Sequence, residues 1–122
     1  IYQSDPALEE WTEHGLGAII HSPGVAHWHA RTFVAGRGKG AEGWVTRLWE
    51  IVDGQAVECI TLPSGGDTAY PGLLVDPASL DAGQPPALFV SWYSQHDRKS
   101  EPNATGNTAS VYVARVVLRD GS

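Results

Sequence analysis

The sequence predicts an all-β fold, and three observations support this class. Glycine and proline total 14 and 8 among the 122 residues, and they interrupt the chain at spacings that suit short strands. Asp53-Gly54 is a strong two-residue hairpin signal between apolar runs. Only Pro6–Trp11, introduced by Ser4-Asp5, suits a helical turn, and it is short enough to be a plain turn.

In the first half of the chain, the strands are expected between these interruptions. Two apolar runs, Gly17–His21 and His27–Ala35, are predicted to be strands, separated by a segment that contains Pro23. The next two, Trp44–Val52 and Ala56–Leu62, flank the Asp53-Gly54 turn and form a hairpin.

The second half contains three further candidate strands. Ala69–Val75 follows a Gly-Gly turn, and Ala87–Ser94 follows Asp76–Pro86, which is rich in Pro, Ala and Gly. Ser110–Leu118 follows Gln95–Ala109, a long polar stretch that is expected to be disordered, a lid or a contact loop.

The expected strands carry apolar residues on both faces. In the last strand Val111 and Val113 lie opposite Tyr112 and Ala114, so strict polar alternation is missing. A sandwich exposes one face of each sheet, whereas a propeller blade is covered on both faces by its neighbours. The pattern favours propeller-like blades of four-stranded antiparallel sheets, with an oligomer interface as the alternative cover.

Composition excludes several classes of function. The formal net charge is −6, and the eight Lys and Arg residues form no stripe, so nucleic acid is not an expected partner. No apolar run suits a membrane span or a signal peptide, which leaves both the bacterial cytoplasm and secretion open. Cys59 is the only cysteine, so no disulfide within the chain and no cysteine metal cluster is expected. The length suits a single domain over residues 1–122.

Asp67-Thr68-Ala69-Tyr70 is the most informative polar site. It lies where a predicted strand begins, and strands position chemical groups more rigidly than loops do. The alternative is that Tyr70 is a packing residue whose hydroxyl is satisfied.

Several segments resemble the closing part of bacterial sialidase-like β-propellers. Ser4-Asp5 followed by Trp11 resembles the Asp-containing turn that repeats between the outer strands of such propellers. The resemblance covers nearly the whole chain. It continues through residues 34–37, 62–73, 90–96 and 111–115.

The resemblance implies a site that acts on an acidic sugar. Sialidases hold the sugar carboxylate with arginines and use a tyrosine nucleophile, which a glutamate activates, with an aspartate as acid/base. By this resemblance Arg37 matches an arginine, Tyr70 matches the nucleophile, and Asp67 joins them at the site. His96 is expected near Tyr70. The implied stacking faces for sugar rings are Trp28 and Trp92.

The implied hydrolase site is incomplete. The remaining arginines, the activating glutamate and the acid/base aspartate of the family lie on earlier blades, and Tyr70 precedes Pro71 where the family has serine. Glu50 and Glu58 are candidate partners of Tyr70 only if the fold brings them near. We therefore expect a glycan-related segment, with a non-catalytic interaction module as the alternative.

The histidines suggest a weaker hypothesis. His27 and His29 are expected on one face of a strand, where His21 or His96 would be needed to complete a zinc site. Strand histidines that line a polar channel or hydrogen-bond to the backbone are the alternative, and neither a metal nor a cofactor is predicted. Gly36–Gly40 is expected to be a hairpin tip, because it lacks the spacing of a phosphate loop.

Strand counting predicts about two blades. The partial blade is residues 1–20, and the two others are residues 27–62 and 69–118. Open blades invite association, so we expect a homo-oligomer in which residues 1–20 of one copy complete the last blade of another. Three copies are favoured, because six blades is the number in sialidases. The alternative is a piece of a longer protein.

Overall fold

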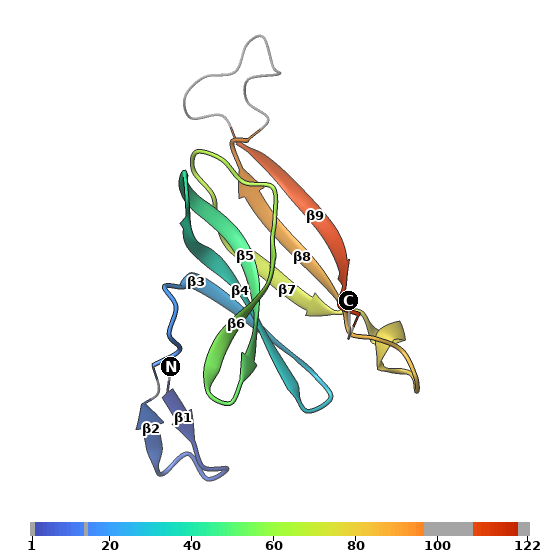
Figure 1. The fold of residues 1–122 in the computed structure, drawn as a ribbon. Helices are drawn as coiled ribbons and strands as arrows, with labels where there is room; N and C mark the ends of the chain where they lie inside the picture. The colour runs from blue at the N-terminus through green and yellow to red at the C-terminus, as the bar shows by residue number, and fades with distance from the viewer. Residues whose placement is uncertain (1, 14, 97–108, 120–122) are drawn as a thin grey trace.

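The structure is a computed structural model that describes residues 2–13, 15–96 and 109–119. The prediction of an all-β fold is confirmed: the described residues form three antiparallel sheets and one short 3-10 helix (Figure 1). No helix in these residues is long and apolar enough to cross a membrane. The elements are β1 (Tyr2–Ser4), β2 (Trp11–Glu13), β3 (His21–Trp28), β4 (Arg31–Gly40), β5 (Gly43–Val52), β6 (Gln55–Thr61), β7 (Ala69–Val75), η1 (Pro77–Leu80), β8 (Ala87–Ser94) and β9 (Ser110–Val117).

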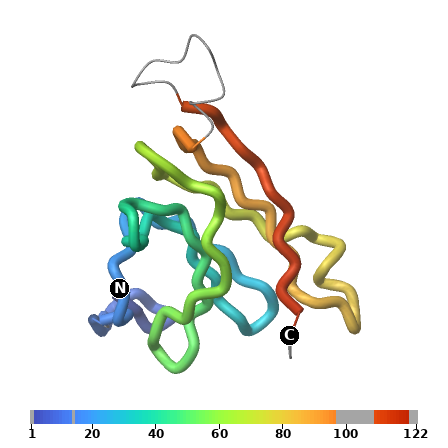
Figure 2. The backbone as a smooth tube through the Cα atoms, turned by 45° about the horizontal axis from the view of Figure 1, so that its top comes forward, coloured from blue at the N-terminus to red at the C-terminus, as the bar shows by residue number. Residues whose placement is uncertain are grey.

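Two of the sheets are meanders of strands that are consecutive in sequence. The four-stranded sheet has the order β3-β4-β5-β6, the three-stranded sheet has the order β7-β8-β9, and β1 and β2 form a separate hairpin. The first strands of the two meanders, β3 and β7, contact each other, so the sheets meet along these strands (Figures 1 and 2).

The hydrophobic core lies between the two meanders. Phe33 and Leu48 from the four-stranded sheet and Leu88 and Val90 from the three-stranded sheet are fully buried in one cluster. Because alternate residues of a strand point to opposite faces, this cluster defines the inner face of each sheet. The inner face of each sheet is apolar and buried, as expected. The outer faces of the two sheets differ in how far they are covered.

The outer face of the four-stranded sheet is covered by residues 15–20 of the same chain. The backbone of Ala56 donates a hydrogen bond to the carbonyl of Leu16, at 2.9 Å. Ile20 lies where a side chain at Gly36 would be, so this strand needs glycine at that position. Trp49, on the same outer face, is only 1% exposed.

Several local predictions are confirmed. Asp53 and Gly54 both have positive φ angles, 50° and 77°, as a two-residue hairpin turn between β5 and β6 requires. The bounds of β7 and β8 match the predicted strands Ala69–Val75 and Ala87–Ser94. The last strand ends at Val117, one residue earlier than expected.

Three predictions about the first half were wrong. His27–Ala35 is not one strand, because the chain turns at His29 and Ala30, and the four-stranded sheet begins at His21. The backbone of His29 has φ +49°, in the left-handed region, and no Gly or Pro in the sequence indicated a turn there. Residues 17–20 form no strand, since they cross the outer face. Gly36–Gly40 lies within β4, and the hairpin tip is at Ala41 and Glu42.

Two segments left open by the sequence have different outcomes. Pro6–Trp11 contains a turn rather than a helix, and the Asp5 carboxylate accepts hydrogen bonds from the backbone of Glu9 and Glu10. Of the polar stretch Gln95–Ala109, residues 97–108 lie outside the described residues.

Candidate functional site

Residues 63–68 connect the two sheets and are held by buried hydroxyl groups. The hydroxyl oxygens of Thr46 and Thr68 lie 2.6 Å apart, and both residues are fully buried. The Thr68 hydroxyl also donates to the carbonyl of Tyr93 at 2.7 Å. The backbone of Thr46 donates to the Ser64 hydroxyl at 2.9 Å. This connection is therefore bonded to both β5 and β8.

Three further hydrogen bonds secure the same connection to the three-stranded sheet. The Trp92 indole donates to the Pro63 carbonyl at 3.0 Å, and the backbone of Gly65 donates to the Ser94 hydroxyl at 3.0 Å. The backbone of Asp67 donates to the Gln95 side chain at 2.8 Å. Asp67 and the start of β7 are consequently held in place from several directions.

Tyr70 is an exposed residue in a strained backbone conformation. Its φ angle is +48°, and its exposed fraction is 74%. The register of β7 against β8 shifts between Ala69 and Gly72, so Tyr70 lies in an irregularity of the strand. A positive φ at a bulky residue costs free energy and is retained where the surroundings enforce it. Because Tyr70 is mostly exposed, the alternative that it is a packing residue of the core does not describe its position.

Asp67 is paired with Tyr93, not with Tyr70. The Tyr93 hydroxyl donates to the Asp67 carboxylate at 3.3 Å, and the rings of Tyr70 and Tyr93 stack with centroids 6.5 Å apart. Burial, followed by the negative charge of Asp67, raises the pKa of Tyr93. Sequence reasoning missed Tyr93 because it treated this residue only as part of an apolar strand. The pairing of Ala69 with Tyr93 across the two strands brings it to the site.

Arg37 lies in a cluster of cationic and aromatic side chains. It pairs with His21 across β3 and β4, and its Nη2 lies 3.1 Å from the imidazole Nδ1. Its guanidinium is 4.5 Å from the Trp44 ring centroid, and the Lys39 ammonium is 4.4 Å from the same ring. The Arg37 Nε is buried and has no hydrogen-bond partner among the described residues. Buried polar atoms without a partner are rare in folded proteins, and this one lies inside the packing of the cluster, where a ligand does not reach it.

The packing of β4 explains why Arg37 points into this cluster. A side chain at Gly38 would meet the Trp49 ring on the outer face, at 3.0 Å. Alternation along the strand then places Arg37 and Lys39 together on the inner face. The positive charge of Arg37 also acts on Tyr93, where it opposes the rise in pKa. The structure thus brings Arg37, Asp67 and Tyr70 to one end of the two sheets.

The other predicted site residues have different positions. The His96 ring lies 4.5 Å from the ring of Tyr112 and 2.8 Å from the Ser94 hydroxyl, next to residues 63–68. Trp92 is only 5% exposed and belongs to the core, so its ring face is closed to a sugar. Trp28 is at the opposite end of β3 from His21, and its indole donates to Ser79.

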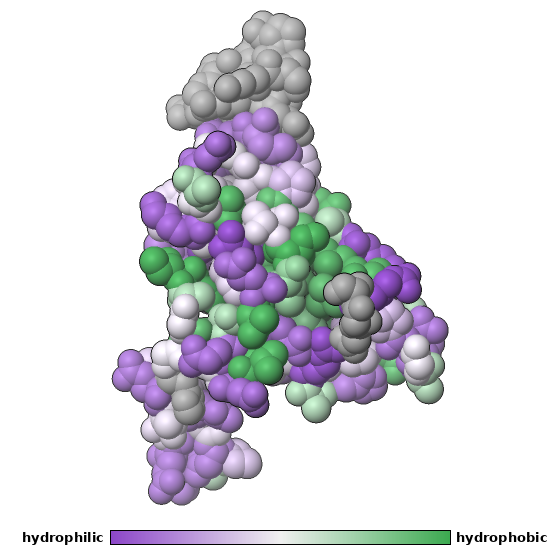
Figure 3. Space-filling model, in the orientation of Figure 1, coloured by the Kyte–Doolittle hydropathy of each residue, from purple (hydrophilic) through white to green (hydrophobic). Residues whose placement is uncertain are grey.

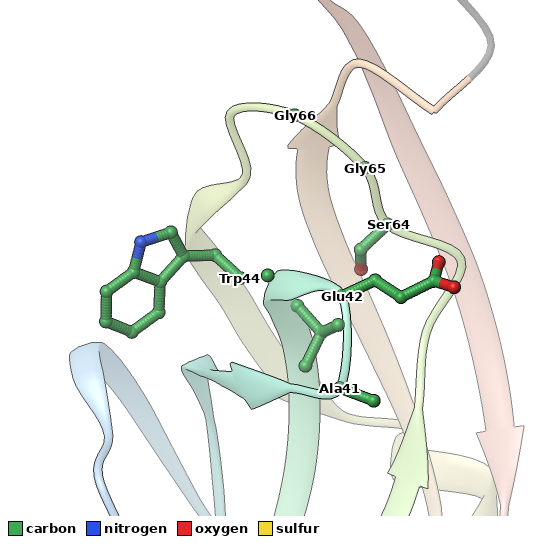
Figure 4. A pocket seen from close by; sticks show the side chains of 8 residues that line it. Ala41, Glu42, Trp44, Ser64, Gly65 and Gly66 are labelled. Carbon is green, nitrogen blue, oxygen red and sulfur yellow. The ribbon is translucent and has the colours of Figure 1, made fainter.

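A hollow of about 550 Å³ lies next to the Arg37 cluster. It is formed by the β4–β5 hairpin tip and by Ser64, Gly65 and Gly66 (Figure 4). In Figure 4 the side chains of Glu42 and Trp44 point to opposite sides of this hairpin. Trp44 lines the hollow and also lies against the Arg37 guanidinium, so it belongs to both.

The two glutamates weighed as partners of Tyr70 are engaged elsewhere. Glu50 accepts two hydrogen bonds of 2.8 Å from Arg31, and this guanidinium lowers the pKa of Glu50. Glu58 lies 3.3 Å from the Arg47 guanidinium. Each of these carboxylates therefore pairs with an arginine, and neither hydrogen-bonds to Tyr70 among the described residues.

The zinc hypothesis gains no support from the described part of the chain. His27 lies in β3 with its Nδ1 3.1 Å from the Thr32 hydroxyl, whereas His29 lies in the following turn. The prediction that both share one strand face was therefore wrong. Within residues 2–13, 15–96 and 109–119, no three His, Cys, Asp or Glu side chains form a group that could hold a metal.

Comparisons with protein-family models, with curated proteins and with solved structures find no match to this chain.

Proposed function

We propose that this chain is a sialidase-like propeller segment that binds an acidic glycan without the complete machinery for hydrolysis. The proposed site, called the Arg37 corner below, lies where β3, β4 and β5 approach the start of β7. The observation that supports it most strongly is the Arg37 guanidinium, which is held over the Trp44 ring and beside the His21 imidazole. The Arg37 corner consists of His21, Arg37, Trp44, Asp67, Tyr70 and Tyr93.

The chemistry of the Arg37 corner suits a sugar acid. A guanidinium binds a carboxylate through two parallel hydrogen bonds, which makes arginine selective for planar anions. The nearby Lys39 ammonium adds positive charge on a chain whose formal net charge is −6. The exposed ring of Tyr70 offers an apolar surface for a sugar ring.

Hydrolysis would require a carboxylate that activates Tyr70. Among the described residues, no carboxylate hydrogen-bonds the Tyr70 hydroxyl, and Asp67 is bonded to Tyr93 instead. Because a phenol is a weak nucleophile at neutral pH without such a base, the geometry favours binding over turnover.

A titration with free N-acetylneuraminic acid, followed by amide chemical shifts, tests the binding proposal. We expect shifts at Arg37, Trp44 and Tyr70, a loss of at least about tenfold in affinity for Arg37→Ala, and a similar loss for Arg37→Lys, since lysine lacks the bidentate fork. Arg115→Ala, on the outer face of β9, is the matched control and should bind as the unmodified chain does. Equal binding of neutral galactose, or unchanged binding by Arg37→Ala, would contradict the proposal.

A fluorogenic sialoside separates binding from catalysis. The unmodified chain and Tyr70→Phe are expected to release the fluorophore at the same background rate. Turnover by the unmodified chain that disappears in Tyr70→Phe would show a working hydrolase and would overturn the binding-only proposal.

A non-catalytic module that self-assembles is the second candidate. It is favoured by three exposed apolar side chains on one sheet, Leu74, Val111 and Val113, which are 64%, 78% and 70% exposed.

A further inference from the structure

The outer face of the three-stranded sheet is apolar and has no cover from the described residues. Val111 and Val113 of β9 point to this face, as does Leu74 of β7, because their neighbours Tyr112 and Leu73 pack against the core. The four-stranded sheet differs, since residues 15–20 cross its outer face and bury Trp49. One of two similar meanders therefore lacks the cover that the other has.

The edge of this sheet at β9 also lacks a neighbour. The third strand of the four-stranded sheet, β5, pairs with both β4 and β6. The third strand of the other sheet, β9, pairs only with β8 among the described residues. It contains no proline and one charged residue, Arg115, which are the features of an edge that accepts another strand.

The β1–β2 hairpin has complementary properties. Tyr2, Leu8 and Trp11 are 68%, 66% and 59% exposed, and no core residue of either meander covers them. The turn of this hairpin is closed by the Asp5 carboxylate. Its described residues 2–13 carry four acidic side chains and no Lys or Arg: Asp5, Glu9, Glu10 and Glu13.

The hairpin does not cover the three-stranded sheet of its own chain. Figures 1 and 2 both place it on the far side of the four-stranded sheet from β8 and β9. In Figure 3 the hairpin, at the lower left, is mostly hydrophilic, in agreement with its acidic residues. A second copy of the chain is the partner that brings the two surfaces together.

Charge distinguishes between the ways in which two copies can meet. Two hairpins in contact would bring four carboxylates against four carboxylates, which is repulsive. The only charged side chain of β9 is Arg115, which is half exposed and paired with Asp76 at 2.9 Å. An acidic hairpin is therefore better matched to β9 than to another hairpin.

We propose that the β1–β2 hairpin of one copy docks as added strands on the free edge of β9 and on the outer face of the three-stranded sheet of the next copy. Each copy then uses its hairpin to bind one neighbour and its three-stranded sheet to bind the hairpin of another. Such a head-to-tail contact closes into a ring or continues as a filament. A hairpin this small buries less area than a standard interface, so we expect association at roughly 100 µM rather than at nanomolar concentration.

Light scattering coupled to size exclusion tests the proposal first. The mass of the unmodified chain is expected to rise with concentration up to about 300 µM and to pass beyond two chains. A monomer throughout this range would overturn the proposal. A mass that stops at two chains would also overturn it, because that result indicates a symmetric contact.

A mixing experiment then identifies the two surfaces. Trp11→Asp blocks the hairpin and Val113→Asp blocks the sheet, and both side chains are exposed enough for the fold to tolerate the change. Each variant alone is expected to be monomeric, and an equal mixture is expected to give a two-chain complex, because each retains the surface that the other lacks. Val57→Asp, an exposed valine on β6, is the matched control and should associate as the unmodified chain does. Self-association of Trp11→Asp alone, or no complex in the mixture, would contradict the head-to-tail contact.

Discussion

The hydroxyl oxygens of Thr46 and Thr68 lie 2.6 Å apart in the buried junction between the two sheets. Thr68 has one hydroxyl proton, and it donates that proton to the carbonyl of Tyr93. Thr46 must then be the donor in the bond between the two threonines. This order of donors links β5 to β8 through a single side chain of the connection at residues 63–68.

The two threonines should differ in their effect on stability. Thr46→Val removes one donor, whereas Thr68→Val removes the acceptor of Thr46 and the donor to Tyr93 together. We expect each change to lower the free energy of unfolding by about 1–3 kcal/mol, with the larger loss for Thr68→Val. Urea unfolding measures both. Thr12→Val, on the exposed strand β2, is the control and should change little; equal values for all three would contradict a buried donor chain.

The ion pair of Arg31 with Glu50 should make stability depend on pH. The pKa of Glu50 lies below its ordinary value of 4.5, because Arg31 donates two hydrogen bonds to the charged form. The contribution of this carboxylate is therefore present above about pH 4.5 and is lost as pH falls through the lower pKa of the folded state. Urea unfolding at several pH values should show a smaller loss on acidification for Glu50→Gln than for the unmodified chain. Identical pH profiles would show that the pair does not contribute.

The charge of Asp67 should be detectable at Tyr93. Asp67→Asn removes a negative charge beside the phenol, so ionisation of Tyr93 becomes easier and its pKa falls toward the ordinary value. Burial remains, and we expect the fall to be partial. Absorbance titration of the phenolate measures it, with Tyr93→Phe identifying the signal that belongs to this residue. A higher pKa in Asp67→Asn would contradict the pairing.

Substitution of Gly36 should be costly in spite of the small change in volume. A Cβ at this position would overlap Ile20 and lie 3.0 Å from the carbonyl of His21. We expect Gly36→Ala to lower the free energy of unfolding by about 1–3 kcal/mol. Gly15→Ala is the matched control, because a Cβ there meets nothing within 4 Å. A neutral Gly36→Ala would show that residues 15–20 leave the sheet easily.

Local signals in the sequence predicted part of the fold well. Asp53-Gly54 requires positive φ angles at both residues, and few other structures satisfy that pair, so its hairpin was recognised. The turn at His29 was missed because a histidine entered the left-handed region without the usual Gly or Asn. The sequence therefore predicted one strand where the structure has β3 and β4. Without that turn, the pairing of His21 with Arg37 across the two strands could not be predicted.

Three of the six residues of the Arg37 corner were named from the sequence, whereas His21, Trp44 and Tyr93 were not named as part of this site. Arg37, Asp67 and Tyr70 were expected from the sequence, and the structure brings them to one end of the sheets. The partner of Asp67 could not be read from spacing, because Tyr93 reaches it only through the register of β7 against β8. The family resemblance remains part of the proposed function.

In the part of the chain that the structure describes, one connection, residues 63–68, joins the two meanders. The strands of the four-stranded meander are joined by two-residue turns, so its contacts are local, whereas the contacts between the two meanders depend on this one crossing. The two meanders nevertheless share one hydrophobic cluster, so neither opens without exposing the core side chains of the other. Hydrogen exchange would then resolve a single opening event for the core strands, with the amides of Thr46 and Gly65 exchanging in step with it.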